Sequence, residues 1–280
     1  MSDSEPAPLN LFVRSVAFDQ QAFENLDGDV RGSFPFDLPL VRNLRIDFDA
    51  PVTFLVGENG TGKSTILESL AVALRCVALG QADLDRDGTL EPARRLSACL
   101  KVVRGTRPRS SVFFRAEDAF GYLQRLRTEI AALDSLEKEF AEQFEDGSLA
   151  QSLAMGSARG QRRALESRYG EDPDAASHGE SFLHLLDERL TAPGLFLLDE
   201  PETPFSPVRI LALLRLLLER ADAGSQLVIA THSPLLLALP GARILCIEDD
   251  GLRTVPYDEV EHVALTRSFL TNPRAFLRRL

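Results

Sequence analysis

A glycine-rich loop set between a strand and a helix narrows the folds open to this chain. Residues 57–65, Gly-Glu-Asn-Gly-Thr-Gly-Lys-Ser-Thr, fit the pattern G-x-x-x-x-G-K-[ST]. The apolar run Val52–Val56 precedes the loop and predicts a buried strand. After the loop, apolar residues recur at helical spacing from Ile66 to Val77, which predicts a helix that ends near Gly80. A strand, a phosphate-binding loop and a helix in this order indicate an α/β fold.

This loop has the chemistry of a phosphate site. Glycines let backbone amides close around phosphate oxygens, and the amino terminus of the helix adds a positive dipole. Lys63 places a point charge on the β and γ phosphates, and Ser64 offers a hydroxyl to Mg²⁺. We therefore predict that a nucleoside triphosphate with Mg²⁺ binds the whole loop: Gly57, Glu58, Asn59, Gly60, Thr61, Gly62, Lys63, Ser64 and Thr65.

Strands and helices alternate through much of the chain. Besides the loop unit, hydrophobic periodicity predicts strands at 11–18, 44–48, 111–115, 195–198 and 227–230, and helices at 182–190 and 208–220. Residues 243–247 and 252–255 predict an antiparallel hairpin. Buried strands that alternate with helices imply a mainly parallel sheet flanked by helices, with antiparallel strands at its margins. We expect one domain over residues 1–280.

Residues 84–176 differ in character and are expected to form an inserted, mostly helical subdomain. Within them, an apolar stripe from Leu123 to Phe144 predicts a helix that packs in a helical pair, with a partner-binding helix as the alternative. Residues 146–175 are rich in small and polar side chains, and we expect them to be mobile.

Two carboxylates end the apolar run 195–200. Ligands of parallel sheets sit at the carboxyl ends of strands, so Asp199 is suited to hold Mg²⁺ through its water shell. Glu200 is suited to polarise the water that attacks the γ phosphate, although an acidic turn would show the same residues. His232 follows the next buried strand, where a place beside the γ phosphate favours a catalytic role over a structural one. Glu200, His232 and Lys63 are the predicted catalytic residues.

A second small-residue turn, Ser177-His-Gly179-Glu-Ser181, precedes a predicted helix. Such a turn is suited to bind an anion, and an ordinary helix cap has the same appearance.

The phosphate loop, the helical insertion, this turn, the acidic strand and the histidine occur in the order of the ATP-binding-cassette (ABC) class, which the chain resembles over nearly its whole length. The segments SHGES, LLDEPE, ATHSP and TRSFLTNPRAFL resemble more closely a family of small stand-alone bacterial ABC-class ATPases, also grouped with AAA-type ATPases. The heads of chromosome-maintenance and break-repair ATPases are related to that family.

The resemblance implies that two copies close head to tail around two ATP molecules. Ser177 and Gly179 would then bind the γ phosphate of the partner's ATP, binding would form a homodimer, and slow hydrolysis would reopen it.

Three departures from the class pattern accompany this resemblance. The class signature LSGGQ is reduced to Ser177 and Gly179, and the loop 202–206 lacks the class aspartate. No glutamine stands at the class position that contacts magnesium. Glu117 is the nearest match, and we expect it to hold Mg²⁺ or its water.

Charge is unevenly distributed along the chain. The net charge is −11, with 31 basic and 42 acidic residues, which disfavours polyanionic partners for the average surface. Residues 94–115, however, hold seven basic side chains and no acidic one, which leaves −18 for the remainder. The strip Arg94–Arg115 is typical of a solvated rim paired with the acids of the insertion, or of a basic wall near the nucleotide; if its side chains share one face, it would contact a nucleic-acid backbone.

Targeting signals and cysteines bear on where the protein acts. No signal peptide or membrane-spanning run is evident and the three cysteines lie far apart, so we expect a reduced, cytoplasmic protein.

Two other functions are the main alternatives to a stand-alone homodimeric ATPase. They are a nucleic-acid-handling ATPase in repair or phage defence and a nucleotide-binding subunit of a membrane transporter. A nucleotide kinase would leave Glu200 and His232 unexplained. We also expect a protein partner whose identity the sequence does not give.

Overall fold

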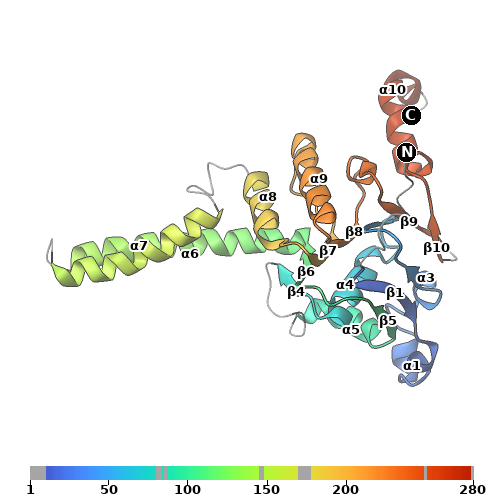
Figure 1. Cartoon of the computed structure of the whole chain (residues 1–280), viewed down its shortest axis with the longest axis horizontal. Coiled ribbons are helices and arrows are strands. Elements are labelled where there is room, and N and C mark those ends of the chain that lie inside the picture. Colours follow the sequence, from blue (N-terminus) through green and yellow to red (C-terminus); the bar gives the residue numbers. More distant parts are fainter. Residues whose placement is uncertain are drawn as a thin grey trace, which may run out of the picture.

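The molecule is built on a seven-stranded sheet in the order β10-β9-β3-β8-β7-β6-β4 (Figure 1). The structure, a computed structural model, describes residues 11–79, 84, 87–144, 148–169, 178–248 and 251–278. Neighbouring strands of the seven-stranded sheet run parallel, except that β9 and β10 form an antiparallel hairpin. The strands are β3 (Val52–Val56), β4 (Val77–Leu79), β6 (Ser110–Arg115), β7 (Gly194–Asp199), β8 (Gln226–Ala230), β9 (Arg243–Glu248) and β10 (Gly251–Thr254). The predicted mainly parallel sheet with an antiparallel margin is confirmed.

Alternate side chains of each central strand pack into two separate buried clusters, one on each face of the sheet. In β7, Phe196 and Leu198 join a buried cluster with helices α8 (His178–Arg189) and α9 (Pro207–Asp222). Leu195 and Leu197 of the same strand join a second cluster with α4 (Lys63–Leu74). A strand turns successive side chains to opposite faces, so a continuous apolar run is buried on both sides. Helices therefore cover both faces of the sheet.

A second, three-stranded antiparallel sheet extends the α4 layer. Its order is β2 (Arg45–Asp47), β1 (Val13–Phe18) and β5 (Leu100–Arg104). Buried Val16 and Ile46 belong to the same cluster as α4. The short helices around this sheet are α1 (Gln20–Glu24), α2 (Gly28–Arg31), α3 (Pro39–Arg42) and α5 (Glu91–Ser97).

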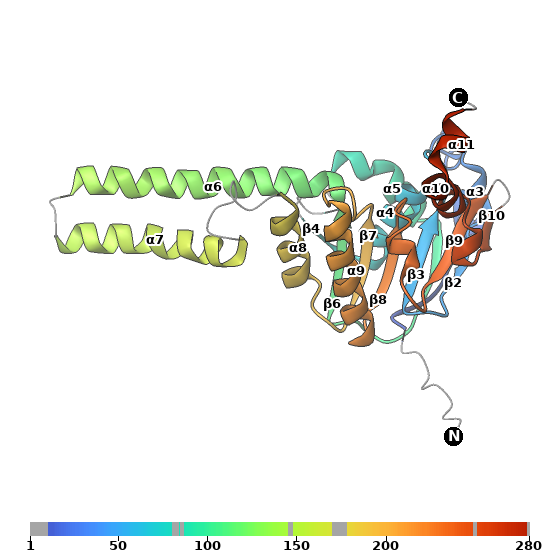
Figure 2. The same cartoon turned by 90° about the horizontal axis from the view of Figure 1, so that it is seen from above.

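Two antiparallel helices extend away from the sheets, as both views show (Figure 2). They are α6 (Ala116–Gln143) and α7 (Leu149–Tyr169). Within the segment 146–175 that was expected to be mobile, residues 149–169 form a regular helix, and the mobility itself stays a prediction. Arg159 and Arg162 of α7 pair with the same Glu137 of α6, at 3.3 and 3.2 Å, so ion pairs join the two helices.

The helix after the phosphate loop ends earlier than its periodicity predicts. Arg75 takes a left-handed conformation with φ 55°, and the amide of Cys76 bonds back to the carbonyl of Ala71. The next residues, 77–79, pair with β6 as an edge strand. Val77 therefore belongs to β4 and not to the helix.

Two helices follow the hairpin, α10 (Glu261–Thr271) and α11 (Pro273–Leu277). Among the residues that the structure describes, no helix has the length and apolarity needed to cross a bilayer.

One buried side chain joins the two sheets. Gln226, at the start of β8, accepts hydrogen bonds from the amides of Phe12 and Val13 through Oε1, each at 2.9 Å. Its Nε2 donates to the carbonyl of Val13, also at 2.9 Å. Since Gln226 is only 1% exposed, these backbone groups have no ready access to water.

Replacing Gln226 with Leu should destabilise the fold while nearly preserving volume. The change leaves two amides and one carbonyl without partners, which we expect to cost about 3 kcal/mol or more in the free energy of unfolding, measured by urea titration. The matched change Gln21→Leu, on exposed α1, should cost less than about 0.5 kcal/mol. Equal losses in the two variants would contradict this role of Gln226.

Candidate nucleotide site

The glycine-rich loop 57–62 leads from the end of β3 into α4. Gly60 and Gly62 have φ values of 84° and 97°, which non-glycine residues rarely adopt. A Cβ on Gly57 would lie 2.9 Å from the Thr61 hydroxyl and 3.0 Å from Cβ of Ile247. The loop is therefore held close to its own chain, with free amides at the amino terminus of α4.

Lys63 begins α4 with its ammonium turned back over the loop. Its Nζ donates to the carbonyls of Gly57 at 2.9 Å and of Glu58 at 2.8 Å. Burial lowers the pKa of Lys63, and the carboxylates of Glu200 and Asp199 oppose that shift. The ammonium thus lies between the loop carbonyls and the acids that end β7.

Asp199 occupies the carboxyl end of β7 and is almost fully buried. Burial raises the pKa of Asp199 to about 7, and nearby Glu68 and Glu200 add to the rise. A hydrogen bond with the Ser64 side chain and the charge of Arg115 act in the opposite direction. Arg115 is itself held by Glu68, at 2.8 Å from Nη1 to Oε1. A carboxylate so poorly solvated favours a neighbouring cation.

These side chains fit a magnesium ion. Oδ1 of Asp199 is buried and has no hydrogen-bond partner within the described ranges, and the Ser64 hydroxyl lies beside the same carboxylate. Oxygen donors of this kind are those that Mg²⁺ takes in phosphate sites. Glu117 lies in the first turn of α6, just beyond Arg115, which pairs with Asp199 in the sheet. Its side chain is exposed at this edge, and its role toward Mg²⁺ stays a prediction.

Glu200 directs its side chain from a strained backbone position. Its φ is 47°, which is uncommon for a residue with a side chain, and its amide donates to the carbonyl of Ala230 at 2.9 Å. The carboxylate is 44% exposed, and its Oε1 lies 3.9 Å from Nε2 of His232. The structure thus brings Glu200, His232 and Lys63 to one edge of the sheet.

Glu202 holds the turn that carries the histidine, a role that sequence reasoning missed. Its Oε1 accepts from the Thr231 hydroxyl at 2.5 Å and from the amide of His232 at 2.9 Å. Glu202 therefore links the loop after β7 to the loop after β8. The signal was a third acid in the LLDEPE run, close to a strand end that needs an acceptor.

A second histidine was also missed. His262, near the start of α10, places its ring 6.4 Å from that of His232, centroid to centroid. Burial lowers the pKa of His262, and His232 and Lys63 lower it further. Nε2 of both rings is buried without a hydrogen-bond partner among the described residues. These two buried nitrogen atoms therefore have unused hydrogen-bonding capacity.

The predicted signature turn is described only from residue 178 onward. Ser177 falls outside the described residues, and Gly179 lies at the start of α8. The three atoms nearest to a Cβ placed on Gly179 belong to Arg209 and Phe205, at 2.8 to 3.4 Å. Glu180 pairs with Arg209 at 2.7 Å. Within one chain, Gly179 therefore packs against α9 and its preceding loop.

The seven basic side chains of the strip differ in their partners. Four of its members are engaged by carboxylates: Arg94 and Arg95 pair with Glu91, Lys101 with Asp19, and buried Arg115 with Glu68. Arg104, Arg107 and Arg109 lie together around a separate hollow.

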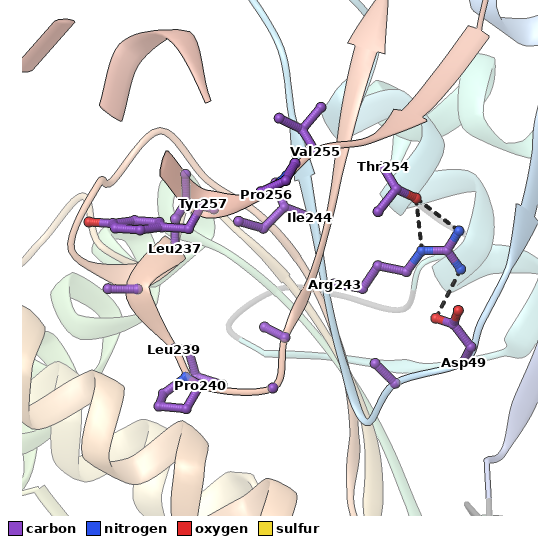
Figure 3. Close-up of a pocket in the computed structure, with 14 residues that line it drawn as sticks. Asp49, Leu237, Leu239, Pro240, Arg243, Ile244, Thr254, Val255, Pro256 and Tyr257 are labelled. Atoms are coloured by element: carbon purple, nitrogen blue, oxygen red, sulfur yellow. Dashed lines mark hydrogen bonds and ion pairs between the residues drawn. The ribbon is translucent and has the colours of Figure 1, made fainter. Parts of the chain in front are cut away.

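A larger cavity, of about 800 Å³, lies at the amino ends of β3 and β9, away from the phosphate loop (Figure 3). Its walls are mostly apolar. Its single arginine, Arg243, pairs with Asp49 at 2.9 Å and donates to the Thr254 hydroxyl at 3.1 Å. This cavity therefore presents a neutralised charge and does not resemble a phosphate site.

Two family models match segments of the chain. One, described as an AAA domain, covers residues 31–84, and the other, described as an AAA domain, putative AbiEii toxin, Type IV TA system, covers residues 181–238. The first segment holds the phosphate loop, and the second holds Asp199, Glu200 and His232. The expected resemblance to AAA-type P-loop ATPases is confirmed.

Solved structures give more distant matches. A nucleotide-free ATP-binding cassette from an ABC transporter is 14% identical with a TM-score of 0.46, over 94% of this chain and 96% of that one. A putative metal-chelate type ABC transporter in an inward-facing conformation is 16% identical with a TM-score of 0.43, over 95% and 90%. A dimeric post-hydrolysis cassette bound to ADP and Pi is 15% identical with a TM-score of 0.39, over 78% and 90%. No curated protein matches the sequence.

Asp199→Asn should change how the stability of the nucleotide-free protein depends on pH. The folded pKa of about 7 lies above the ordinary 3.8, so the carboxyl group stabilises the fold below about pH 4. This contribution is lost as the pH rises to 7. From about pH 5 to about pH 8, urea titration should show the wild type losing about 2–3 kcal/mol more than Asp199→Asn.

The exposed variant Asp222→Asn serves as the control and should follow the wild type at both pH values. If Asp199→Asn also follows the wild type, the Asp199 carboxylate is not desolvated as described.

Proposed function

We propose that this protein binds ATP with Mg²⁺ and hydrolyses it, and that two copies enclose two nucleotides between them. The observation that carries the proposal is the meeting of Lys63, Ser64, Asp199, Glu200 and His232 at the carboxyl edge of one parallel sheet. Three different segments supply these residues. A glycine-rich turn that binds no nucleotide would not require two acids and a histidine beside it.

The phosphate loop supplies the ground-state contacts. Loop amides and the dipole of α4 receive the phosphates, and Lys63 exchanges the carbonyls of Gly57 and Glu58 for β and γ oxygens. The exchange keeps the ammonium hydrogen-bonded while adding a charge-assisted contact. Ser64 and Asp199, with Glu117 as a further candidate, would hold Mg²⁺. That ion neutralises charge on the phosphate oxygens when bound.

Glu200 and His232 act on the attacking water. Glu200 accepts a hydrogen bond from the water and receives its proton as the oxygen approaches phosphorus in line. His232, held by Glu202 through its backbone amide, is positioned to donate to the γ phosphate or to the water. The positive φ of Glu200 and the hydrogen bond to Ala230 fix the carboxylate at the edge of the sheet.

The dimer is proposed from the class resemblance and from the surroundings of Gly179. The three atoms nearest to a Cβ placed on Gly179 belong to Arg209 and Phe205, and none of them belongs to the phosphate loop of the same chain. Ser177 and Gly179 of a second copy would cover the nucleotide. Binding of ATP would then favour the closed dimer, because each nucleotide contacts both chains.

Glu200→Gln should stop hydrolysis while ATP still binds. The amide keeps the shape of the carboxylate but cannot accept the proton, so phosphate release should fall by about 100-fold or more. Because the nucleotide then persists, sedimentation with saturating Mg-ATP should show a stable dimer. The exposed variant Glu24→Gln should keep the wild-type rate. A Glu200→Gln protein that stays monomeric would contradict the sandwich.

A mixing experiment tests whether the signature turn acts in trans. Lys63→Ala removes the phosphate contact, and Ser177→Arg blocks the turn, so each variant alone should be inactive. In a mixed dimer, one site combines an intact loop with an intact turn, and random pairing should restore roughly a quarter of the wild-type rate. Phosphate release from the mixture measures this recovery.

Two outcomes would contradict the trans arrangement. The first is a mixture no more active than the two variants alone. The second is a Ser177→Arg monomer that no longer binds ATP, since the turn would then belong to the site of its own chain.

A further inference from the structure

A basic hollow of about 630 Å³ lies at the end of the sheet opposite the phosphate loop. It opens at the amino ends of β6 and β7, where Ser111 and Leu195 contribute to its wall. Asp199 lies at the other end of the same strand β7, about 13 Å away at the usual rise per residue. The hollow is therefore separate from the nucleotide site.

Four arginines line this hollow: Arg75, Arg104, Arg107 and Arg109. All four are exposed, and none of the described residues that line the hollow is acidic. Within the described ranges, Arg75, Arg107 and Arg109 have no ion pair and no side-chain hydrogen bond. The hydroxyl-bearing residues Thr106 and Ser111 also line it. The hollow thus presents unneutralised positive charge beside hydrogen-bonding groups.

The backbone that carries these arginines is already fixed. A Cβ on Gly105 would lie 1.9 Å from the carbonyl oxygen of Leu11, so the two segments cross at closest approach. The amides of Gly105 and Thr106 donate to the carbonyls of Phe12 and Leu11, at 2.8 and 3.3 Å. The left-handed turn at Arg75, which also lines the hollow, ends α4. Binding here would therefore not require folding of the loop.

Two comparisons within the molecule show how unusual this charge is. The arginine of the larger cavity, Arg243, is neutralised by Asp49 (Figure 3). In the basic strip itself, Arg95 and Lys101 are paired with Glu91 and Asp19. In a chain of net charge −11, a hollow with four arginines and no described acid departs from the average surface.

We propose that this hollow binds the phosphate backbone of a nucleic acid. Several guanidinium groups around one opening match a polymer with a phosphate on every residue better than a single small anion. The apolar floor is buried, since Phe12 and Val13 are 6% and 2% exposed. No described lining residue therefore offers an exposed aromatic ring for base stacking, and binding should be independent of sequence.

The hollow also has a direct connection to the nucleotide site. Helix α4 begins at Lys63 in the phosphate loop and ends beside Arg75, a span of about 18 Å. Arg104 donates to the carbonyl of Ala73 in its last turn, at 2.9 Å. The inference does not rest on ATP hydrolysis, because binding is measured without nucleotide.

Fluorescence anisotropy with labelled mixed-sequence DNA, single-stranded and duplex, tests the proposal. The full chain should bind at low salt, and affinity should fall as salt rises from about 50 to about 200 mM. Arg107→Gln with Arg109→Gln should weaken binding about tenfold or more at low salt. The slope of log K against log salt should become shallower by about 2.

The matched control is Arg95→Gln with Lys101→Gln, which removes the same charge from paired positions of the strip. It should bind nearly as the wild type does. Equal weakening in both double variants would overturn the proposal, because net charge alone would explain it. So would absence of DNA binding at low salt, or binding only of pyrophosphate or of phosphatidylserine vesicles. Loss of hydrolysis in Glu200→Gln with DNA binding retained would leave this inference intact.

Discussion

The site depends on one electrostatic constraint, a lysine and two carboxylates held at the edge of a largely apolar sheet. Burial lowers the pKa of Lys63 and raises the pKa of Asp199. Both shifts show that water solvates the charged form of each group poorly. Such a set of groups is more favourable with phosphates and a divalent cation than without them. The buried ion pair of Arg115 and Glu68 lies next to it and supports the same strand end.

The two-layer fold makes that constraint possible. Because β3, β7 and β8 are largely apolar on both faces, the charged residues of this site lie at or just beyond their carboxyl ends. Parallel pairing then brings residues distant in sequence to one edge: the phosphate loop after β3, Glu200 after β7 and His232 after β8. Glu202 links the last two loops, so the geometry of the histidine depends on the acid-bearing loop.

Two segments differ from what their local patterns suggested, for one physical reason. The periodicity of residues 66–77 suggested a helix throughout, but a left-handed residue at Arg75 ended it and Val77 joined the sheet. The small and polar side chains of residues 146–175 suggested a mobile segment, whereas 149–169 form helix α7, whose arginines pair with α6. In both cases a contact with a segment distant in sequence outweighed the local pattern. In the basic strip, Asp19 and Glu68 from distant segments pair with Lys101 and Arg115, whereas Arg94 and Arg95 pair with Glu91 of their own helix.

The sequence by itself determined the phosphate loop, the two acids after a buried strand, the histidine after the next one, and the mainly parallel sheet. These follow from local spacing, because loop glycines, strand ends and helix starts are set by neighbouring residues. Only the tertiary structure decided that Glu202 holds the histidine turn and that His262 lies beside His232. It also decided which arginines surround the open hollow. Pairing and burial depend on which distant segments meet, and no local pattern records that.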